Sequence, residues 1–342
     1  MKKRFGIRDI AELTGYSVAT VSRVLNRKGK YSAAAEAAIL KAAEKNHYLP
    51  DVQAKGLKSK RSRYIGILIP DFSIHFYFSL ARLIQIELIG KDYYPIYLNV
   101  GPNALTLDKG MEILMSLNAA GIVCISSQID NSFLDQLDIP VVYVNRMFSE
   151  LDKLQTHANR SSVSMDYRQG SALAAKELYD KGCRKVTFIT TEFQGMSMQS
   201  NQQKKQSFQD VAAHLGMEYV DFTDKNPVDN VYEASYRSAK ALFGAHPDVD
   251  GIFCGSNYCA IGIASYLSEQ GIDVPGQVQI ISFGQTYGLE MAVKAFSAIE
   301  IPEKLLAREA SRLIIDLAEQ EDMPLKEVIV PVSFVKGVTT KP

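Results

Sequence analysis

Short apolar clusters recur at helical spacing along the first fifty residues, with polar positions between them. Ile10 and Ala11 mark one face of a first predicted helix, and Val21 and Val24 mark one face of a second. The segment Gly15–Ser17 between them predicts a tight turn, because glycine accepts left-handed backbone angles and serine caps helices. Each helix is too short to be stable alone, so the pattern predicts that both pack on a third helix.

That third helix is predicted to begin after Ser32, which can cap it, and Ile39 lies on its apolar face before the pattern stops near Asn46. We therefore expect an N-terminal all-α helix-turn-helix head over residues 1–50. A polar linker over residues 51–63 joins this head to the rest of the chain.

The body of the chain, residues 64–342, alternates apolar β-branched runs with helical stretches. The predicted strands are 64–70, 95–100, 121–126, 140–145, 185–190, 218–222, 251–255 and 278–283. The predicted helices include 80–90, 170–181, 234–243 and 260–270. Near-continuous apolar strands separated by helices are typical of parallel sheets that are covered on both faces. The number of such units predicts an α/β body of two doubly wound parallel-sheet lobes.

Charge is unevenly distributed between these parts. The 342 residues have a formal net charge of zero, but residues 1–63 carry a net charge of +10 and the remainder carries −10. A basic head on an acidic body indicates a polyanionic partner, such as nucleic acid, for the head alone.

The second predicted helix combines a buried apolar face with a polar outer face. Such a helix fits the major groove of DNA, with its first residues near the base edges. Arg23 can bond guanine in bidentate fashion, while Ser17 and Thr20 are better suited to phosphates. Further candidates for DNA contact on this helix are Val18, Ala19, Ser22, Asn26 and Arg27. The alternative is a generic three-helix bundle with a charged surface.

Several other classes of protein lack support. The longest apolar stretches fall short of a membrane span, and no secretory signal follows the basic start. The four cysteines are scattered, so we expect reduced thiols in a cytoplasmic protein. Nucleophile-elbow, Walker, zinc-protease and Gly-x-Gly motifs are missing, and His75 has no second metal ligand nearby. We therefore expect neither an enzyme nor a bound cofactor or metal.

The segment IRDIAELTGYSVATVSRVLN resembles the head of the lactose-repressor/galactose-repressor family of bacterial transcriptional regulators. The second helix of that family commonly reads V-S-x-x-T-V-S-R-V-x-N, and here Tyr16 replaces the first valine. The matching positions are Ser17, Thr20, Val21, Ser22, Arg23, Val24 and Asn26. The resemblance implies that Val18, Ala19 and Arg23 read bases in a near-palindromic double-stranded operator bound by a homodimer.

Residues 51–63 resemble the family's hinge helix, usually written N-x-x-A-R-S-L. Leu57 matches the leucine that wedges into the minor groove, Ala54 lies one turn earlier, and Lys55 lies between them. An isolated, exposed linker leucine is the alternative for Leu57. The resemblance implies that the hinge folds only when two copies meet on DNA, so that a change in the body that separates the hinges releases the operator.

The body resembles periplasmic sugar-binding proteins, with a ligand cleft between two lobes that are joined by three crossovers. We expect these crossovers near Ser161–Met165, Ala292–Ala298 and Glu321–Lys326. The first lobe would then hold residues 64–161 and 293–323, and the second lobe residues 162–292 and 324–342.

Effector-binding residues depart from the family pattern. The motif P-D-x-x-N-P-F-F appears as Pro70–Tyr77 without its Asn-Pro, and the usual sugar-binding aspartate of G-F-D is Gly284. A lost carboxylate removes a bidentate acceptor for a diol, which disfavours a simple neutral sugar. An acidic or phosphorylated sugar is compatible with the remaining cations. The residues that the resemblance assigns to the cleft are Phe72, Ile74, His75, Phe76, Arg146, Lys204, Asn257, Tyr258, Gly284 and Tyr287.

Together these features predict a sequence-specific, DNA-binding repressor of carbohydrate-related genes, controlled by a small-molecule effector in the cleft. One alternative keeps the DNA-binding role but replaces the effector with a phosphorylated partner protein. A more distant alternative is a sugar-binding transport component, against which the basic head argues. The family's tetramerising leucine-heptad tail is missing, which favours a dimer.

Overall fold

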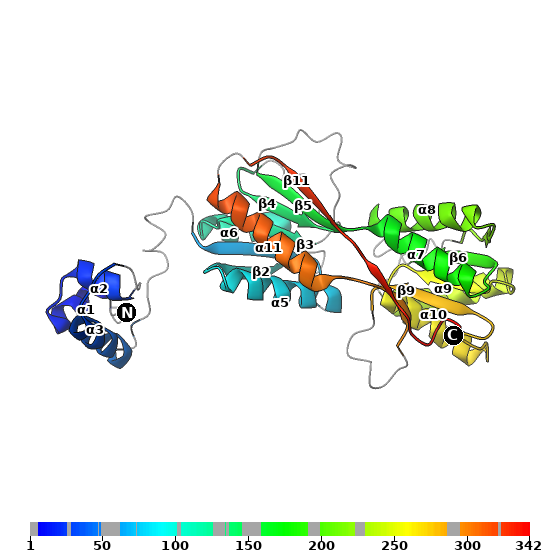
Figure 1. The fold of residues 1–342 in the computed structure, drawn as a ribbon, viewed down its shortest axis with the longest axis horizontal. Coiled ribbons are helices and arrows are strands. Elements are labelled where there is room, and N and C mark those ends of the chain that lie inside the picture. Colours follow the sequence, from blue (N-terminus) through cyan, green and yellow to red (C-terminus); the bar gives the residue numbers. More distant parts are fainter. Residues whose placement is uncertain are drawn as a thin grey trace. The chain divides into compact units, whose positions relative to one another are not determined.

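The computed structural model of the protein describes residues 6–25, 29–46, 48, 62–72, 74–100, 104–125, 134, 137–145, 159–190, 199–222, 230–285, 295–320 and 323–342. The chain divides into two compact units, the head up to Ser62 and the body from Arg63 (Figure 1). The predicted hinge contacts of Ala54, Lys55 and Leu57 lie outside the described residues.

The described part of the head contains helices α1 (Ile7–Thr14), α2 (Val18–Leu25) and α3 (Ala33–Lys45). They pack around one small core, whose buried apolar residues are Ile10, Val21, Val24, Ala35 and Ile39. Because every helix contributes to this core, none of them needs to be stable alone. The predicted helix-turn-helix head is confirmed.

Local hydrogen bonds fix the turn between α1 and α2. Gly15 has a φ of 75° and donates its backbone N–H to the Ala11 carbonyl at 2.9 Å, which ends α1. The Ser17 hydroxyl accepts the backbone N–H of Thr20 at 3.1 Å and so caps α2. Glycine and serine therefore act at this turn as their positions predict.

The described residues of the body form two six-stranded sheets (Figure 1). In spatial order the first sheet contains β11 (Lys326–Val330), β5 (Arg160–Met165), β4 (Val141–Val144), β3 (Gly121–Ile125), β1 (Tyr64–Ile69) and β2 (Tyr94–Asn99). The second contains β12 (Ser333–Val335), β10 (Ser297–Glu300), β9 (Gln279–Phe283), β8 (Gly251–Cys254), β6 (Lys185–Ile189) and β7 (Glu218–Tyr219). Neighbouring strands are parallel except β12, which is antiparallel to β10. The predicted pair of doubly wound lobes is confirmed.

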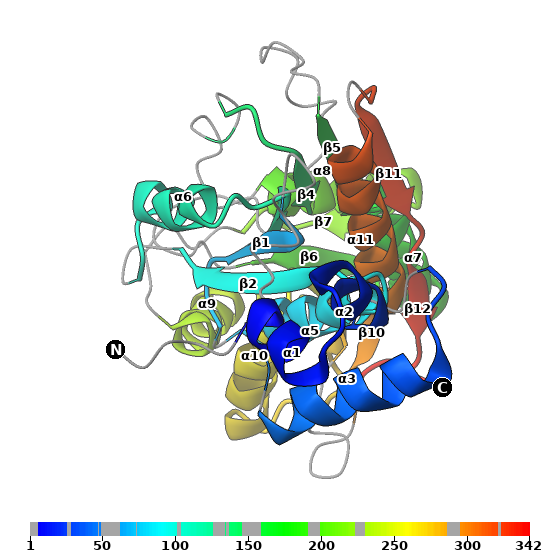
Figure 2. The ribbon, with the colours of Figure 1, turned by 90° about the vertical axis from the view of Figure 1, so that its left-hand side faces the viewer.

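Helices cover both faces of the first sheet. Helices α5 (His75–Ile89) and α11 (Glu303–Glu319) lie side by side on one face (Figure 2), and α6 (Leu107–Ser116) packs on the other. Gly66 in β1 faces Leu114 of α6, and a Cβ added at this position would clash with the leucine side chain. This coverage explains why the strands are apolar on both sides.

The second lobe is built in the same way. Helices α7 (Tyr167–Asp180) and α8 (Gln199–His214) pack on one face of its sheet, and α9 (Val231–Ala245) and α10 (Asn257–Glu269) pack on the other (Figure 1).

The crossovers between the lobes differ from the predicted positions. The stretch 160–165 is itself a fully buried strand, β5, so the first crossover lies at Asp166. Strand β10 stays in the second sheet and β11 pairs with β5 of the first, which places the later crossovers at 301–302 and 331–332. The lobe boundaries 161, 293 and 323 therefore shift. The physical reason is that β5 is rich in serine, and that a hydrophobic pattern does not show which sheet a strand such as β10 or β11 joins.

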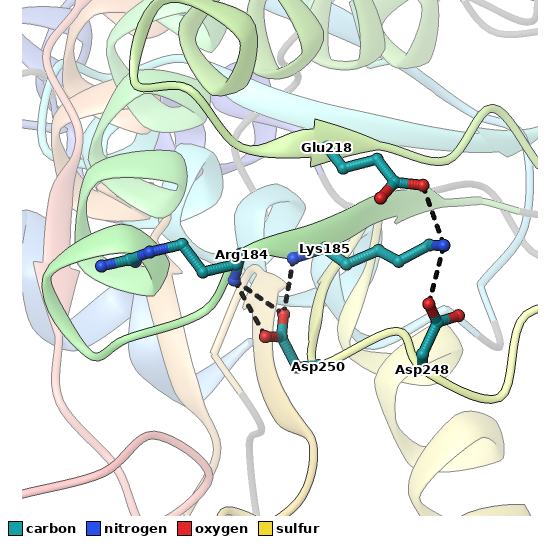
Figure 3. Close-up of polar contacts among 5 residues, drawn as sticks. All are labelled: Arg184, Lys185, Glu218, Asp248 and Asp250. Carbon is teal, nitrogen blue, oxygen red and sulfur yellow. Dashed lines mark hydrogen bonds and ion pairs between the residues drawn. The ribbon is translucent and has the colours of Figure 1, made fainter.

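Charged side chains fix the amino ends of the second sheet (Figure 3). The Asp250 carboxylate accepts the backbone N–H groups of Arg184 and Lys185 at 2.9–3.0 Å. The Lys185 ammonium pairs with Glu218 at 2.8 Å and with Asp248 at 2.9 Å. These contacts raise the pKa of Lys185 and lower the pKa of Asp248. They lie at the opposite ends of the strands from the cavity described below, so their role is structural.

None of the helices in the described part of the chain combines the length and apolar composition needed to cross a membrane. The described residues also contain no group of three or more histidine, cysteine, aspartate or glutamate side chains arranged to hold a metal ion. The four cysteines are buried free thiols.

Candidate DNA-binding face and effector cavity

Helix α2 presents the predicted DNA-binding residues on its outer face. Val18, Ala19 and Arg23 are exposed, on the side opposite the buried Val21 and Val24. Because these positions are spaced by one and four residues, a single helix turn brings them to one surface.

The remaining candidates on α2 are partly engaged within the head. The Ser17 and Thr20 hydroxyl groups lie 2.9 Å apart, and Ser22 is partly buried. A hydroxyl pair at the start of a helix, beside backbone N–H groups, suits contact with a phosphate. Asn26 and Arg27 lie outside the described residues.

The body contains a cavity of about 380 Å³ between its two lobes. Its walls are formed largely by residues at the carboxyl ends of the parallel strands, where ligands bind in open α/β sheets. The lining residues are Asp71, Ile74, Phe76, Tyr77, Asn145, Met165, Tyr167, Thr190, Ser200, Asn201, Lys204, Asn230, Val231, Tyr232, Gly255, Ser256, Asn257, Tyr258, Phe283, Gly284, Gln285 and Ile301.

The first lobe brings only part of its predicted set to this cavity. Ile74 and Phe76, at the start of α5, line it. Phe72 is 40% exposed and His75 is also exposed, and neither belongs to the lining. Because α5 begins at His75, successive residues point in different directions, and a linear motif cannot show which of them face inward.

In the second lobe, Lys204, Asn257, Tyr258 and Gly284 line the cavity as the resemblance implies. Arg146 and Tyr287 lie outside the described residues.

Sequence reasoning missed several lining residues from both lobes. They include the polar residues Asp71, Asn145, Thr190, Asn201, Asn230 and Gln285 and the aromatic residues Tyr77, Tyr167 and Tyr232. Asn145 and Thr190 are the last residues of two predicted strands and directly follow the observed strands β4 and β6, so their place at a strand's carboxyl end was a usable signal.

Gln285 lines the cavity and is hydrogen-bonded to the second crossover. Its side-chain oxygen accepts the Ile301 backbone N–H at 2.8 Å, and its side-chain nitrogen donates to the Ile301 carbonyl at 3.3 Å. The Asn257 amide nitrogen in turn donates to the Gln285 carbonyl at 3.1 Å. A ligand that displaces either side chain would therefore act on the backbone that connects the lobes.

Lys204 is the buried cation of the cavity. Its side-chain ammonium donates to the Gly255 carbonyl at 2.9 Å and lies 4.6 Å from the centre of the Phe283 ring. Burial lowers the pKa of Lys204 to about 7, because the charged form loses its hydration and none of the described carboxylates pairs with it.

A basic helix-turn-helix head and an interlobe cavity on one chain define the class of ligand-controlled DNA-binding regulators. The comparisons agree with this class. Residues 6–51 match the model for bacterial regulatory proteins of the lacI family, and residues 175–340 match the periplasmic binding protein-like domain.

Full-length similarity extends over both parts. The chain is 28% identical over 335 residues to the ribose operon repressor of Halalkalibacterium halodurans, covering 98% of this chain and 97% of that protein. The lac repressor dimer bound to operator and the anti-inducer ONPF has a TM-score of 0.80 at 16% identity, with 99% of each chain covered. A LacI-family regulator from Enterococcus faecium with bound ribose has a TM-score of 0.64 at 19% identity, covering 82% of this chain and 99% of that chain. At these identities the solved structures show a shared fold.

The chain belongs to the lactose-repressor/galactose-repressor family: it is a DNA-binding transcriptional regulator, not an enzyme, with a periplasmic-binding-protein-like effector domain.

Proposed function

We propose that this regulator represses carbohydrate-related genes by binding a near-palindromic operator, and that an effector in the interlobe cavity controls this binding. The observation that carries the proposal is the pairing of an exposed recognition face on α2 with a polar, aromatic-lined cavity in the same chain. The relative from Halalkalibacterium halodurans is named a ribose operon repressor, which supports a sugar-related target.

Within the head, Val18, Ala19 and Arg23 would contact base edges, and Ser17 and Thr20 would contact phosphates. The side chains of Val18 and Ala19 are small and exposed, which suits apolar contact with a thymine methyl group. Hinge residues Ala54, Lys55 and Leu57 would enter the minor groove, where an apolar wedge bends the duplex at a flexible base step.

The effector would be a carbohydrate derivative, specifically a sugar acid or a sugar phosphate. Side-chain amides around the cavity can bond hydroxyl groups, and ring faces such as those of Tyr77 and Phe283 can cover the apolar face of a sugar. Gly284 has no carboxylate to bond a diol, while Lys204 offers a cation to an anionic group.

We expect the protein to act as a homodimer, because a two-fold operator is read by a two-fold protein. An apolar surface suited to this role runs along α5 onto the edge strand β2. Phe78, Ile86 and Ile89 are each at least half exposed, and Tyr94 is 40% exposed. A related structure is described as the lac repressor dimer, which supports a paired assembly.

Fluorescence anisotropy with labelled duplexes tests the proposal. Near-palindromic duplexes, including one with a central CG step, are titrated with the full-length protein at one stated salt concentration, since phosphate contacts make affinity salt-dependent. We expect tight binding to one duplex that changes when a sugar acid or sugar phosphate is added. Binding no stronger than to random DNA would contradict the operator role.

Two further results would redirect the proposal. Leu57→Ala is expected to weaken specific binding far more than non-specific binding, and an equal loss of both would rule out the wedge. If the operator binds tightly and no compound changes its affinity, control by a phosphorylated partner protein would be favoured. The altered cleft motif at Pro70–Tyr77 is compatible with that alternative.

A further inference from the structure

Lys204 occupies an unusual position within the cavity. Among the described lining residues it is the one basic side chain, and Asp71, from the other lobe, is the one acidic side chain. Lys204 lies on α8 with only 5% of its surface exposed, and the described part of the chain provides it with no carboxylate partner. A buried ammonium group normally has such a partner, because an isolated buried charge is costly.

The described residues around Lys204 satisfy only part of the hydrogen-bonding capacity of its ammonium group. An ammonium group has three N–H donors, and the Gly255 carbonyl accepts one of them at 2.9 Å. The rings of Phe283 and Tyr167 lie 4.6 Å and 5.7 Å from the nitrogen and attract a cation weakly. Anionic oxygens from a ligand would supply the missing acceptors and the missing counter-charge together.

We propose, building on the effector role proposed above, that Lys204 contacts the anionic group of the effector and takes up a proton as that group binds. The cavity then selects polyols that carry a carboxylate or phosphate, and it binds them more weakly as the pH rises.

The pKa of Lys204 itself agrees with this assignment. Burial holds the pKa of Lys204 near 7, so the free protein contains both charged and neutral Lys204 at neutral pH. Tyr167 of α7 and Cys259 of α10 face the same side chain. A hydrogen bond with Cys254 lowers the pKa of the Cys259 thiol, and the nearby Lys204 charge lowers it further. Cys259 is therefore the second group whose ionisation must be separated from that of Lys204.

The direction of the pH effect follows from the lysine. Below pH 7 the amine is mostly protonated and ready to bind an anion, and above pH 7 binding must be coupled to proton uptake. For a carboxylate ligand that stays ionised throughout, the affinity should fall about tenfold between pH 6 and pH 8.

Titration calorimetry on the full-length protein measures this coupling. The ligands are D-ribonate, D-gluconate, ribose 5-phosphate and glucose 6-phosphate, with ribose and glucose as neutral counterparts. Each is titrated at pH 6, 7 and 8 in two buffers of different ionisation enthalpy, which gives the number of protons bound. We expect an anionic ligand to bind with uptake of about half a proton at pH 7. A phosphate group itself titrates in this pH range, whereas the carboxylates of the two sugar acids stay ionised. With the sugar acids, the measured proton uptake therefore reports on the protein alone.

Four variants assign the effect to a residue. Lys204→Met should abolish binding of the anion, and Lys204→Arg should retain binding without the pH dependence, because arginine stays charged. Lys205→Met is the matched control. The Lys205 ammonium pairs with Asp221 at 2.6 Å, and Lys205 does not line the cavity, so effector binding should be unchanged. Cys259→Ala should keep the pH dependence of the wild type.

Several results would overturn the proposal. One is that neutral sugars bind as tightly as their acids, and another is that no anionic ligand binds at all. A third is an affinity that stays constant from pH 6 to pH 8. The fourth is a pH dependence that disappears in Cys259→Ala but persists in Lys204→Arg. Operator binding is measured on the same preparations. Intact operator binding with any of these results refutes the role of Lys204 alone, whereas loss of operator binding refutes the proposed function itself.

Discussion

The candidate DNA-binding face of α2 and the interlobe cavity are assembled in different ways. The candidates on α2 that the structure describes fall within seven consecutive residues, Ser17–Arg23, and the periodicity of one helix brings Val18, Ala19 and Arg23 to one surface. The cavity collects side chains from residue 71 to residue 301, and the pairing order of two sheets brings them together. A local surface can therefore be read from a short motif, whereas a composite one depends on the whole topology.

The two regions also differ in how they treat charge. Arg23 is exposed and keeps its hydration until DNA arrives, while Lys204 is buried and its amine is only partly protonated near neutral pH. The head is therefore positively charged at all physiological pH values and attracts a polyanion. The positive charge in the cavity depends on protonation of Lys204 and suits a small anion. The following changes are designed to separate these two behaviours, from the largest expected effect to the smallest.

Val21→Asn should abolish operator binding while leaving the body intact. Val21 is fully buried in the small head core, and an amide without partners there should cost roughly 3 kcal/mol or more. Anisotropy measures the loss, and calorimetric unfolding should show an unchanged transition for the body. Leu13→Asn is the control, because Leu13 is 62% exposed on α1. Retained operator binding by Val21→Asn would show that the head core is not needed.

Lys204→Met should stabilise the body, and the gain should depend on pH. The pKa of Lys204 is lowered in the folded protein from 10.5 to about 7, so protonation favours the unfolded chain. This cost is complete below pH 7 and fades as the pH rises toward 10.5. The variant should therefore gain on the order of 4 kcal/mol at pH 7 and much less at pH 10. Urea unfolding at both pH values tests this, and an equal gain at both would contradict it.

Arg23→Ala should weaken operator binding by about 2 kcal/mol, the usual effect of losing one bidentate contact with guanine. Binding to random DNA should change less, because other basic groups in the head still contact phosphates. The measurement is the ratio of specific to non-specific affinity at one salt concentration. A parallel fall in both affinities would reassign Arg23 to the phosphate backbone.

Gly284→Ala should destabilise the body by about 1 kcal/mol without altering operator affinity in the absence of effector. Gly284 has a φ of 93°, and an added Cβ would lie 3.1 Å from Cδ1 of Ile301 at the second crossover. Thermal unfolding shows the effect, with Gly216→Ala as a matched left-handed glycine whose Cβ would meet nothing within 4 Å. An equal loss in both variants would mean that the backbone angle alone, and not the contact with Ile301, sets the cost.

Much of the architecture follows from the hydrophobic pattern. The helices of the head and strands such as β1, β3, β6 and β8 appear in the sequence, because continuous β-branched runs and helical spacing are local signals. Strand β5 was missed because it is built largely from Arg160 and serines, which become buried only when β4 and β11 pair with the strand and α11 packs across it. The guanidinium of Arg160 donates to the carbonyl groups of Leu134, Leu137 and Ile139, and these partners are far away in sequence.

By itself, therefore, the sequence determined the class of the protein and the charge contrast between head and body, and it predicted which residues form the DNA-binding face, since each of these depends on neighbouring residues. Only the tertiary structure decided which side chains line the cavity, where the chain crosses between lobes, and that Lys204 is buried without a carboxylate partner among the described residues. Those properties depend on distances between segments that are remote in the chain, and strand pairing, helix packing and the crossovers set these distances together.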